Sequence, residues 1–290
     1  MVVLKACPLC GSSDIYHHMT SKDYFLSQEA FTIDSCPKCK LRFTNPRPKP
    51  SDLNKYYQSD NYISHSNQTN GLINRLYQIV RKRTLKQKFR LLSKHLSSKE
   101  RIQHLDYGCG TGHFTQFASN RGWKSIGYEP NNRAQQLHNP LVFNSLDTIN
   151  SNSPYDVITL FHVLEHVSDL NETIINLLAM LKADGILVLA LPNLESCDAQ
   201  HYQEQWAGYD LPRHLYHFNQ KSVAYLANKY GIHIEKTRAM VYDSFYVSML
   251  SEKYKNAKGR FMKGIKQGFR SNMSARQNME YSSLIYIIRK

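Results

Sequence analysis

Three glycines and a carboxylate lie close together early in the chain, directly after a short apolar run that predicts a strand. Asp106 ends this run, and Gly108, Gly110 and Gly112 alternate with other residues behind it. Glycine lets the backbone turn sharply and approach a ligand closely, and open α/β sheets bind ligands at the carboxyl ends of their strands. His113 stands where the dinucleotide-binding pattern has its third glycine, so the segment predicts a ligand-binding turn of another kind.

Two pairs of cysteines near the N-terminus have the spacing of a metal site. Cys7 pairs with Cys10 and Cys36 with Cys39, each as Cys-x-x-Cys. Two such pairs are typical of a structural zinc ion bound by four thiolates, which here would also supply folding energy to a segment with little apolar content. Two disulfides or redox-active cysteines are the alternatives. The first residues do not resemble a signal peptide, so we expect a reducing, cytoplasmic setting that favours the metal.

A first group of candidate catalytic residues follows the strand predicted at 156–161. His162, Glu165 and His166 have the i, i+3, i+4 spacing that places three side chains on one face of a helix. Such a set could bind a divalent ion. Alternatively, His162 and His166 could be general bases, or His162 could flank a bound cofactor.

A second group lies in an aromatic-rich stretch near residue 214. His214 and His217 are candidate general bases, and Arg213 beside them is a candidate anchor for an anion. The alternative for both histidines is that they pack against the sheet. Asn219 has the residue type and position of an N-cap for the next helix.

Short apolar strands and amphipathic helices alternate through the middle of the chain and must position these groups. The strands are expected at residues 102–105, 124–128, 141–143, 156–161 and 186–191. This alternation is typical of an α/β fold, with a mostly parallel sheet and helices on both faces. We expect a zinc ribbon at residues 1–45, a linker or lid at 46–71 and the α/β domain at 72–290.

The runs LDYGCGTG (105–112) and FHVLEHV (161–167), with a carboxylate at the end of the second strand, resemble the class I S-adenosylmethionine-dependent methyltransferases. The resemblance implies a doubly wound, Rossmann-like sheet of seven strands, with a late strand inserted beside the fifth. It implies that Asp106 and the glycine turn hold the methionine portion of the cofactor, Glu129 the ribose, and the stretch with Ser145 and Leu146 the adenine. The full set of implied cofactor contacts is Asp106, Gly108, Cys109, Gly110, Gly112, Glu129, Pro130, Ser145, Leu146, Phe161 and His162.

Quinone-biosynthesis O-methyltransferases are similar at FHVLEHV but have Glu where this chain has His162. Hard divalent ions prefer carboxylate ligands, so this substitution weakens the prediction of a metal at that point.

Basic residues are concentrated in two segments of a chain whose net charge is +14. Residues 75–101 predict an amphipathic helix with a cationic face. Residues 251–275 predict a mobile loop or weak helix, before a final strand in the last ten residues. The positive charge either faces solvent or attracts phosphates of a nucleic acid, a nucleotide-linked substrate or a lipid headgroup.

The leading hypothesis is methyl transfer to a small-molecule acceptor, such as a sugar, a lipid or another metabolite precursor. The alternative is an RNA methyltransferase, but the Asn/Asp-Pro-Pro-aromatic motif of base-amino methylation is missing after the strand at 156–161. A third hypothesis is cofactor binding without catalysis. No apolar run is long enough to span a membrane. The sequence does not indicate an oligomeric state.

Overall fold

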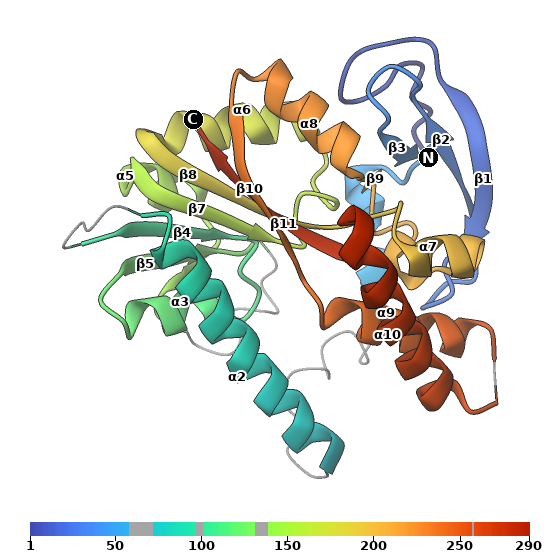
Figure 1. The fold of residues 1–290 in the computed structure, drawn as a ribbon. Helices are drawn as coiled ribbons and strands as arrows, with labels where there is room; N and C mark the ends of the chain where they lie inside the picture. The colour runs from blue at the N-terminus through green and yellow to red at the C-terminus, as the bar shows by residue number, and fades with distance from the viewer. Residues whose placement is uncertain (58–71, 97–100, 131–138, 257) are drawn as a thin grey trace. The chain divides into compact units, whose positions relative to one another are not determined.

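In the described part of the protein the strands form two sheets, one of seven strands and one of four (Figure 1). The computed structural model describes residues 1–57, 72–96, 101–130, 139–256 and 258–290. Within these residues, no helix has both the length and the apolar character needed to cross a membrane.

The larger sheet has the strand order β10-β11-β8-β7-β4-β5-β6. Its strands are β4 (Gln103–Tyr107), β5 (Lys124–Tyr128), β6 (Val142–Phe143), β7 (Tyr155–Phe161), β8 (Leu181–Pro192), β10 (His233–Ala239) and β11 (Ser283–Arg289). β4 pairs in parallel with both β5 and β7, and β11 is antiparallel to β10. The prediction of a mostly parallel α/β sheet of seven strands is therefore confirmed, and the late strand β11 lies beside β8 as expected.

The position of β4 between β5 and β7 makes it the point where the strand order reverses. In open α/β sheets a crevice opens at such a point, beyond the carboxyl ends of the strands, and ligands bind there. Asp106 of β4 is paired with Gly127 of β5 and with Thr159 of β7. The residues that follow these three positions are therefore the ones that can reach a ligand.

Helices alternate with the strands of the larger sheet along the chain. They are α2 (Leu72–Ser93), α3 (His113–Ser119), α5 (Leu146–Ser151), α6 (Leu170–Met180), α7 (Cys197–Tyr202), α8 (Gln220–Lys229), α9 (Asp243–Tyr254) and α10 (Arg260–Asn278). The predicted N-cap of α8 is confirmed, because the Asn219 side chain accepts a hydrogen bond from the Ser222 backbone N–H at 2.8 Å. The Ser222 hydroxyl in turn accepts one from the Asn219 N–H, which completes a capping box.

The smaller sheet is antiparallel and has the order β1-β2-β3-β9. Its strands are β1 (Tyr16–Lys22), β2 (Ala30–Ser35), β3 (Arg42–Thr44) and β9 (Tyr216–His217). Strand β9 pairs with β3 through Arg42–His217 and Phe43–Tyr216. The cysteine-bearing segment is thus joined by main-chain pairing to the second histidine group.

The chain contains two compact units. The ribbon unit consists of Met1–Tyr57, His162–Ile175 and Leu189–Arg289, and the turn unit consists of Gln58–Phe161 and Asn176–Val188 with Lys290. The predicted segment boundaries at residues 45 and 71 stay a prediction, and residues 58–71 of the expected lid lie outside the described residues.

Strand β8 begins at Leu181, before the predicted start at residue 186. Leu181 is buried, and the Lys182 ammonium donates to Asp156 of the neighbouring strand β7 at 2.9 Å. The Lys182 contact joins the extra residues to β7.

Of the two alternatives for residues 251–275, a mobile loop or a weak helix, the structure agrees with a helix: the segment contains the end of α9 and most of α10, which pack closely against each other. A Cβ atom on Gly264 would lie 2.6 Å from the Cα of Met249, and one on Gly268 would lie 2.8 Å from the Cα of Phe245. The helix pair is thus held by small residues that let the backbones approach. A prediction based on large apolar residues misses such a pair.

Candidate functional site

The glycine turn of the turn unit follows β4, and all three of its glycines have left-handed backbone conformations, with φ of 71°, 54° and 73° at Gly108, Gly110 and Gly112. The N–H groups of Gly108 and Cys109 both donate to the carbonyl of Tyr128, at 2.7 and 3.0 Å. The turn is therefore bonded to the end of β5. A Cβ on Gly110 would meet no atom of the described residues within 4 Å, so the backbone there borders open space within this part of the protein.

Asp106 lies beneath this turn and is 3% exposed. Its Oδ1 accepts a hydrogen bond from the hydroxyl of Thr159 at 2.8 Å, and its Oδ2 accepts one from Thr115 at 3.0 Å. Burial raises the pKa of Asp106, and the two hydroxyls offset part of that rise. Each carboxylate oxygen can accept a second hydrogen bond, so the two threonines fix its orientation without exhausting its acceptors.

A buried histidine supports this arrangement from below. Nε2 of His104 lies 2.9 Å from the hydroxyl of Thr159, and Nδ1 lies 2.7 Å from that of Ser125. Because Thr159 donates its own hydrogen to Asp106, the hydrogen between it and His104 belongs to Nε2. Burial lowers the pKa of His104 to about 3, so the ring is neutral and Nδ1 accepts from Ser125.

Glu129 lies at the end of β5, where its Oε2 accepts a hydrogen bond from the N–H of Gly110 at 3.0 Å. A carboxylate and the open backbone of the glycine turn thus share one corner of the sheet. This set fits an adenosine-type ligand, which needs a bidentate acceptor for two ribose hydroxyls and a backbone that allows close approach. The cofactor assignment itself stays a prediction.

Cys109 does not have the surroundings of a nucleophile. Its side chain packs against Gly127, where an added Cβ would lie 2.5 Å from the Cys109 sulfur. Burial raises the pKa of the Cys109 thiol, so the thiolate is disfavoured. The backbone of Cys109, rather than its sulfur, is the part available to the turn.

The other predicted cofactor contacts of the turn unit are Phe161, Ser145, Leu146 and Pro130. The ring of Phe161 packs edge-on against Phe114 with 5.2 Å between centroids, and the Lys88 ammonium lies 3.6 Å from the centroid of Phe161. Ser145 is the N-cap residue of α5, and Leu146 after it is 48% exposed. Pro130 is exposed as well.

The four cysteines of the ribbon unit come together as predicted. The sulfurs of Cys7 and Cys39 are 3.4 Å apart, those of Cys10 and Cys36 are 3.5 Å apart, and all four lie within 4.8 Å of one another. All are free thiols. A hydrogen bond from Cys39 lowers the pKa of Cys7 to about 5.

The two cysteine turns have the same main-chain hydrogen bonds. Gly11 donates to the Cys7 carbonyl and Lys40 to the Cys36 carbonyl, both at 2.9 Å. Both donors are in the left-handed region, with φ of 73° and 62°. The turns are therefore copies of one knuckle, which is the geometry that brings four sulfurs to one point.

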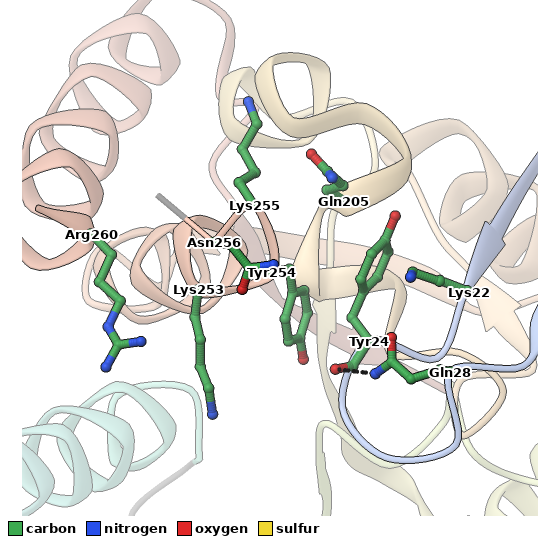
Figure 2. Close-up of a pocket in the computed structure, with 9 residues that line it drawn as sticks. All are labelled: Lys22, Tyr24, Gln28, Gln205, Lys253, Tyr254, Lys255, Asn256 and Arg260. Atoms are coloured by element: carbon green, nitrogen blue, oxygen red, sulfur yellow. Dashed lines mark hydrogen bonds between the residues drawn. The ribbon is translucent and has the colours of Figure 1, made fainter. Parts of the chain in front are cut away.

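A cavity of about 460 Å³ opens elsewhere in the ribbon unit (Figure 2). Its lining residues are Lys22, Tyr24, Gln28, Gln205, Lys253, Tyr254, Lys255, Asn256 and Arg260. None of the predicted site residues is among them.

The histidine groups of the ribbon unit meet around a buried carboxylate. Glu165 is 0% exposed, and neither of its carboxylate oxygens has a hydrogen-bond partner among the described residues. Nδ1 of His162 lies 3.3 Å from Oε1, which is close enough for an ion pair but not aligned as a hydrogen bond. Glu165, His166 and His214 offer ligand atoms within 4.8 Å of one another. The carboxylate thus joins residues from both predicted groups.

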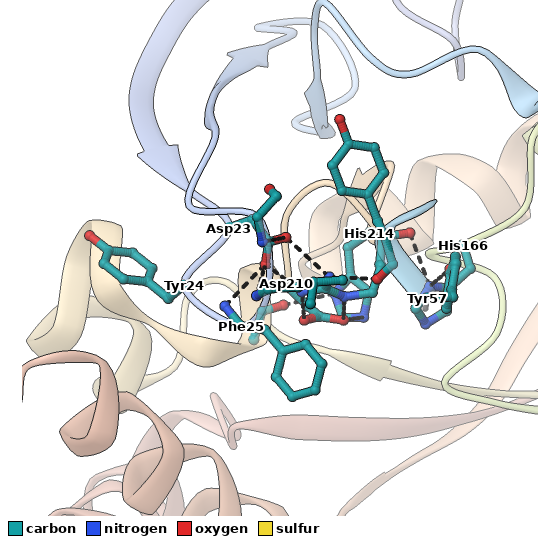
Figure 3. Close-up of polar contacts among 12 residues, drawn as sticks. Asp23, Tyr24, Phe25, Tyr57, His166, Asp210 and His214 are labelled. Carbon is teal, nitrogen blue, oxygen red and sulfur yellow. Dashed lines mark hydrogen bonds and ion pairs between the residues drawn. The ribbon is translucent and has the colours of Figure 1, made fainter. Parts of the chain in front are cut away.

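His166 and His214 are held in the same way by backbone carbonyls (Figure 3). Nδ1 of His166 lies 3.0 Å from the carbonyl of Arg213, and Nδ1 of His214 lies 2.9 Å from that of Gly208. A carbonyl oxygen only accepts, so Nδ1 of His214 carries the hydrogen, and in the neutral His214 ring Nε2 is the basic nitrogen. Nδ1 of His166 also lies 3.1 Å from the Tyr57 hydroxyl, which can donate or accept.

The charges of this cluster are set by competing effects. Burial alone would lower the pKa of His162, but its contacts with Asp243 and Glu165 outweigh burial and raise this pKa to about 9. For Glu165, burial raises the pKa, and the neighbouring histidines outweigh it, so the pKa is lowered. Burial and the neighbouring His166 lower the pKa of His214 to about 4. At neutral pH, His162 is therefore protonated, Glu165 is ionised and His214 is neutral.

Two residues of the second group have other roles in the structure. All five N–H groups of Arg213 are directed at acceptors of the same unit, so it does not present a free guanidinium to an anion; the acceptors are Asp23, Asp210 and the Tyr56 carbonyl. His217 is buried in β9, and its Nε2 lies 3.2 Å from the hydroxyl of Thr44. The second arrangement agrees with the packing alternative for His217.

The sequence of the central part of the chain matches a known family. A family model described as "Methyltransferase domain" matches residues 77–237. The chain belongs to this methyltransferase family.

Curated relatives of this methyltransferase-family chain carry a common name. The ubiquinone biosynthesis O-methyltransferase of Rhodopseudomonas palustris (strain TIE-1) is 30% identical over 116 residues, which cover 37% of this chain and 46% of the relative. That of Rickettsia canadensis (strain McKiel) is 20% identical over 168 residues, which cover 52% and 71%. The chain thus spans about half the length of the first of these relatives.

Solved structures are similar at a lower level. A SAM-dependent methyltransferase from Archaeoglobus fulgidus is 19% identical, with a TM-score of 0.44 over 72% of this chain and 94% of that one. A cyclopropane synthase from Mycobacterium tuberculosis is 15% identical, with a TM-score of 0.47 over 70% of this chain and 83% of that one. Likeness at this level carries no argument about activity.

Several residues that shape the sites of this methyltransferase-family chain were not foreseen from its sequence. Thr115 and Thr159 orient Asp106, and Asp243 contacts His162 at 3.1 Å from the start of α9. Thr159 lies within the predicted strand, so the strand pairing could have indicated it. Asp243 is separated from His162 by 81 positions, and no spacing pattern connects the two.

Proposed function

We propose that the chain transfers the methyl group of S-adenosylmethionine to a small-molecule acceptor, such as a sugar, a lipid or another metabolite precursor. The observation that carries this proposal is the hydrogen bond from Gly110 to Glu129, at the strand-order reversal of a sheet in a methyltransferase-family chain. The name of the curated relatives, ubiquinone biosynthesis O-methyltransferase, supports an acceptor oxygen on a small molecule.

In this proposal the turn unit holds the cofactor. Asp106 and the backbone from Gly108 to Gly112 bind its methionine portion, Glu129 binds the ribose hydroxyls, and Leu146 borders the adenine. The bound cofactor supplies a methyl group that its sulfonium already activates, so the protein has only to align the acceptor and to take up its proton.

We place the general base that takes up this proton in the histidine cluster around Glu165. At neutral pH, His162 already carries a proton, so it is a poor base in this state. His166 and His214 each place a ring nitrogen near the ionised Glu165, which stabilises a histidine that takes up a proton. His166 is the better candidate, because burial holds the pKa of His214 at about 4.

A structural zinc ion is the proposed occupant of the cysteine cluster. Zinc bound by four sulfurs at about 2.3 Å requires sulfur separations of about 3.8 Å, which the four thiols nearly satisfy without an ion. A closed site of four thiolates leaves no position for a substrate. Its role in the proposal is therefore to hold the two knuckles together.

Titration calorimetry with S-adenosylmethionine and S-adenosylhomocysteine tests the proposal first. We expect micromolar binding of both that RNA does not change at low or high salt, followed by methyl transfer to a hydroxylated small molecule in a radiolabel assay. Tight, salt-dependent RNA binding that accompanies cofactor binding would favour the RNA methyltransferase alternative instead. No cofactor binding at all would refute the proposal.

A further inference from the structure

The cavity in the ribbon unit is lined by four cations and no carboxylate. They are Lys22, Lys253, Lys255 and Arg260, and none of them forms an ion pair with an acidic side chain of the described residues. Of the carboxylates next to lining residues in the chain, Glu252 accepts a hydrogen bond from the Tyr202 hydroxyl at 3.0 Å. Glu204 is exposed beside Gln205, and burial together with the Glu204 charge raises the pKa of Tyr24. The lining itself therefore has an excess of positive charge, which Glu204 offsets only in part.

The main chain adds to this positive potential. Arg260 is the first residue of α10, a helix of 19 residues whose N-cap is Gly259. Neither a side-chain cap nor an acidic residue in the first turn satisfies the N–H groups at this end. A free helix N-terminus carries about half a positive charge and binds anions. The C-terminal end of α9 carries about half a negative charge, which partly cancels this potential. Lys253 and Lys255, on either side of Tyr254, offset that negative charge.

Two tyrosines form an aromatic wall in the same cavity. The rings of Tyr24 and Tyr254 stack with 5.2 Å between centroids and an interplanar angle of 18°. Figure 2 shows the two rings facing each other among the lining side chains. The Lys22 ammonium lies 5.0 Å from the centroid of Tyr24, so an aromatic face and a cation are presented together.

The wall that carries Tyr24 is fixed before any ligand binds. Asp23, which precedes Tyr24, is fully buried and accepts hydrogen bonds from the N–H groups of Phe25, Leu26 and Ser27 at 2.9 to 3.1 Å. The same carboxylate pairs with Arg213 at 2.9 Å. A loop held in this way loses little freedom on binding, which favours affinity.

The opposite wall is fixed as well. In α9, the hydroxyl of Ser251 accepts a hydrogen bond from the N–H of Ala207 at 2.9 Å, next to the turn that contributes Gln205. Gln28 and Asn256, one on each wall, have left-handed φ of 59° and 51°. Non-glycine residues in this region are uncommon and gather at binding sites.

We propose that this cavity binds a diphosphate-bearing small molecule of the nucleotide type, with its phosphates at Lys253 and Arg260 and its base against the tyrosine wall. Figure 2 shows these two side chains on the same side of the cavity, whereas the Lys255 ammonium lies 5.5 Å from the centroid of Tyr202. The volume of about 460 Å³ lies in the range of small-molecule sites. Two or more negative charges match two cations, and a planar ring extends the stacked pair of tyrosines. This binding does not depend on the proposed methyl transfer.

Calorimetry on the full-length protein, without S-adenosylmethionine, tests the proposal with UDP, ADP, inorganic pyrophosphate and uridine. We expect UDP and ADP to bind more tightly than pyrophosphate, uridine not to bind, and affinity to fall as salt rises. Pyrophosphate that binds as tightly as UDP would overturn the nucleotide assignment. Absence of binding by all four probes at low salt would overturn the site.

Matched variants locate the binding. Lys253→Gln with Arg260→Gln should weaken UDP at least about tenfold, because two charge-assisted contacts are lost. Lys263→Gln with Lys266→Gln removes the same charge from exposed positions of α10 outside the cavity and should change affinity less than about twofold. Equal losses in both pairs would show a diffuse field and overturn the site. The site would also be overturned if the protein preferred RNA or anionic vesicles and if that binding were unchanged in Lys253→Gln with Arg260→Gln.

The tyrosine wall has its own test, which remains valid if the charge variants fold poorly. Tyr24→Leu should bring UDP affinity down to that of pyrophosphate while leaving pyrophosphate binding unchanged, because only the base contact is lost. Unfolding temperatures measured in parallel show that the variants are folded. An unchanged UDP affinity in folded Tyr24→Leu would refute the stacking of a base.

Discussion

Arg213 and Asp23 form a buried ion pair although 190 positions separate them in the chain. Nη2 of Arg213 lies 2.9 Å from Oδ1 of Asp23, and the two side chains are 1% and 0% exposed. Asp210 supplies a second carboxylate to the same guanidinium at 2.8 Å. The pair links the β1–β2 loop to the stretch before β9 within the ribbon unit.

Replacement of this arginine should therefore destabilise the ribbon unit strongly. Arg213→Lys keeps the charge but cannot reach both carboxylates with a planar fork, and we expect a loss of about 3–5 kcal/mol in the free energy of unfolding. Urea denaturation followed by circular dichroism measures it. Arg289→Lys, in the half-exposed pair with Glu235, is the control and should cost less than about 1 kcal/mol. Equal costs would show that the buried network is not formed.

Glu129 is the residue whose loss should most directly report on cofactor binding. Glu129→Ala removes the acceptor at the glycine turn, and we expect S-adenosylmethionine affinity to fall by about 1–3 kcal/mol, since a hydrogen-bonding group is left unpaired. Titration calorimetry measures the change, with Glu172→Ala at an exposed position of α6 as a control that should bind normally. Asp106→Ala should weaken binding to a similar extent. Unchanged affinity in both variants would sink the cofactor assignment.

The cysteine cluster predicts a metal content of one zinc ion per chain. Cys36→Ser removes one of four ligands, so we expect elemental analysis to find the zinc lost and proteolysis of the N-terminal segment to increase. Cys197→Ser, at the start of α7 and remote from the cluster in sequence, should retain the metal. A full zinc equivalent in purified Cys36→Ser would contradict the four-thiolate site.

The His162 contacts should make stability depend on pH in the alkaline range. The pKa of His162 is raised to about 9 from an ordinary value of 6.5, because Asp243 and Glu165 outweigh the effect of burial. The folded state then binds the proton more tightly than the unfolded state. The resulting stabilisation is complete below pH 6.5 and is lost as the pH rises through about 9.

Urea denaturation between pH 5 and pH 10 measures this dependence, and Asp243→Asn supplies the comparison. The variant removes one of the two carboxylates, so its stability should fall less over the same range than that of the wild-type protein. Parallel curves for the two proteins would show that Asp243 does not set the charge of His162.

The sequence predicts those parts of the protein in which one local pattern determines the structure. Alternating apolar strands and helices gave the parallel sheet, and two Cys-x-x-Cys pairs gave the knuckles. Asn219 was recognised as an N-cap from its type and position. In each of these cases the interacting residues lie within a few positions, or repeat a spacing that only one structure satisfies.

The parts that the sequence does not predict depend on contacts between distant segments. Asp243 and Asp23 are ordinary acidic residues by local pattern, and only the folded chain shows that they contact His162 and Arg213. The cavity cations come from β1, from α9 and the residue after it, and from α10, so no single segment of the sequence indicates that they share a cavity. The sequence predicts a loop or weak helix for residues 251–275 because they include few large apolar residues. In the structure, small residues hold this segment in place.

Replacement of Gly264 in the α9–α10 contact should change stability, and the direction of that change tests whether the two helices pack closely. Alanine favours a helix over glycine by about 1 kcal/mol, so Gly264→Ala would stabilise α10 if its surroundings were open. The added Cβ would instead meet backbone atoms of Met249 at 2.6 and 2.8 Å, which no rotamer change can relieve. We expect a net loss of about 1–3 kcal/mol in the free energy of unfolding. Ser274→Ala, on the exposed face of the same helix, should be neutral or slightly stabilising. A Gly264→Ala variant as stable as the wild-type protein would mean that the two helices do not approach each other this closely in solution.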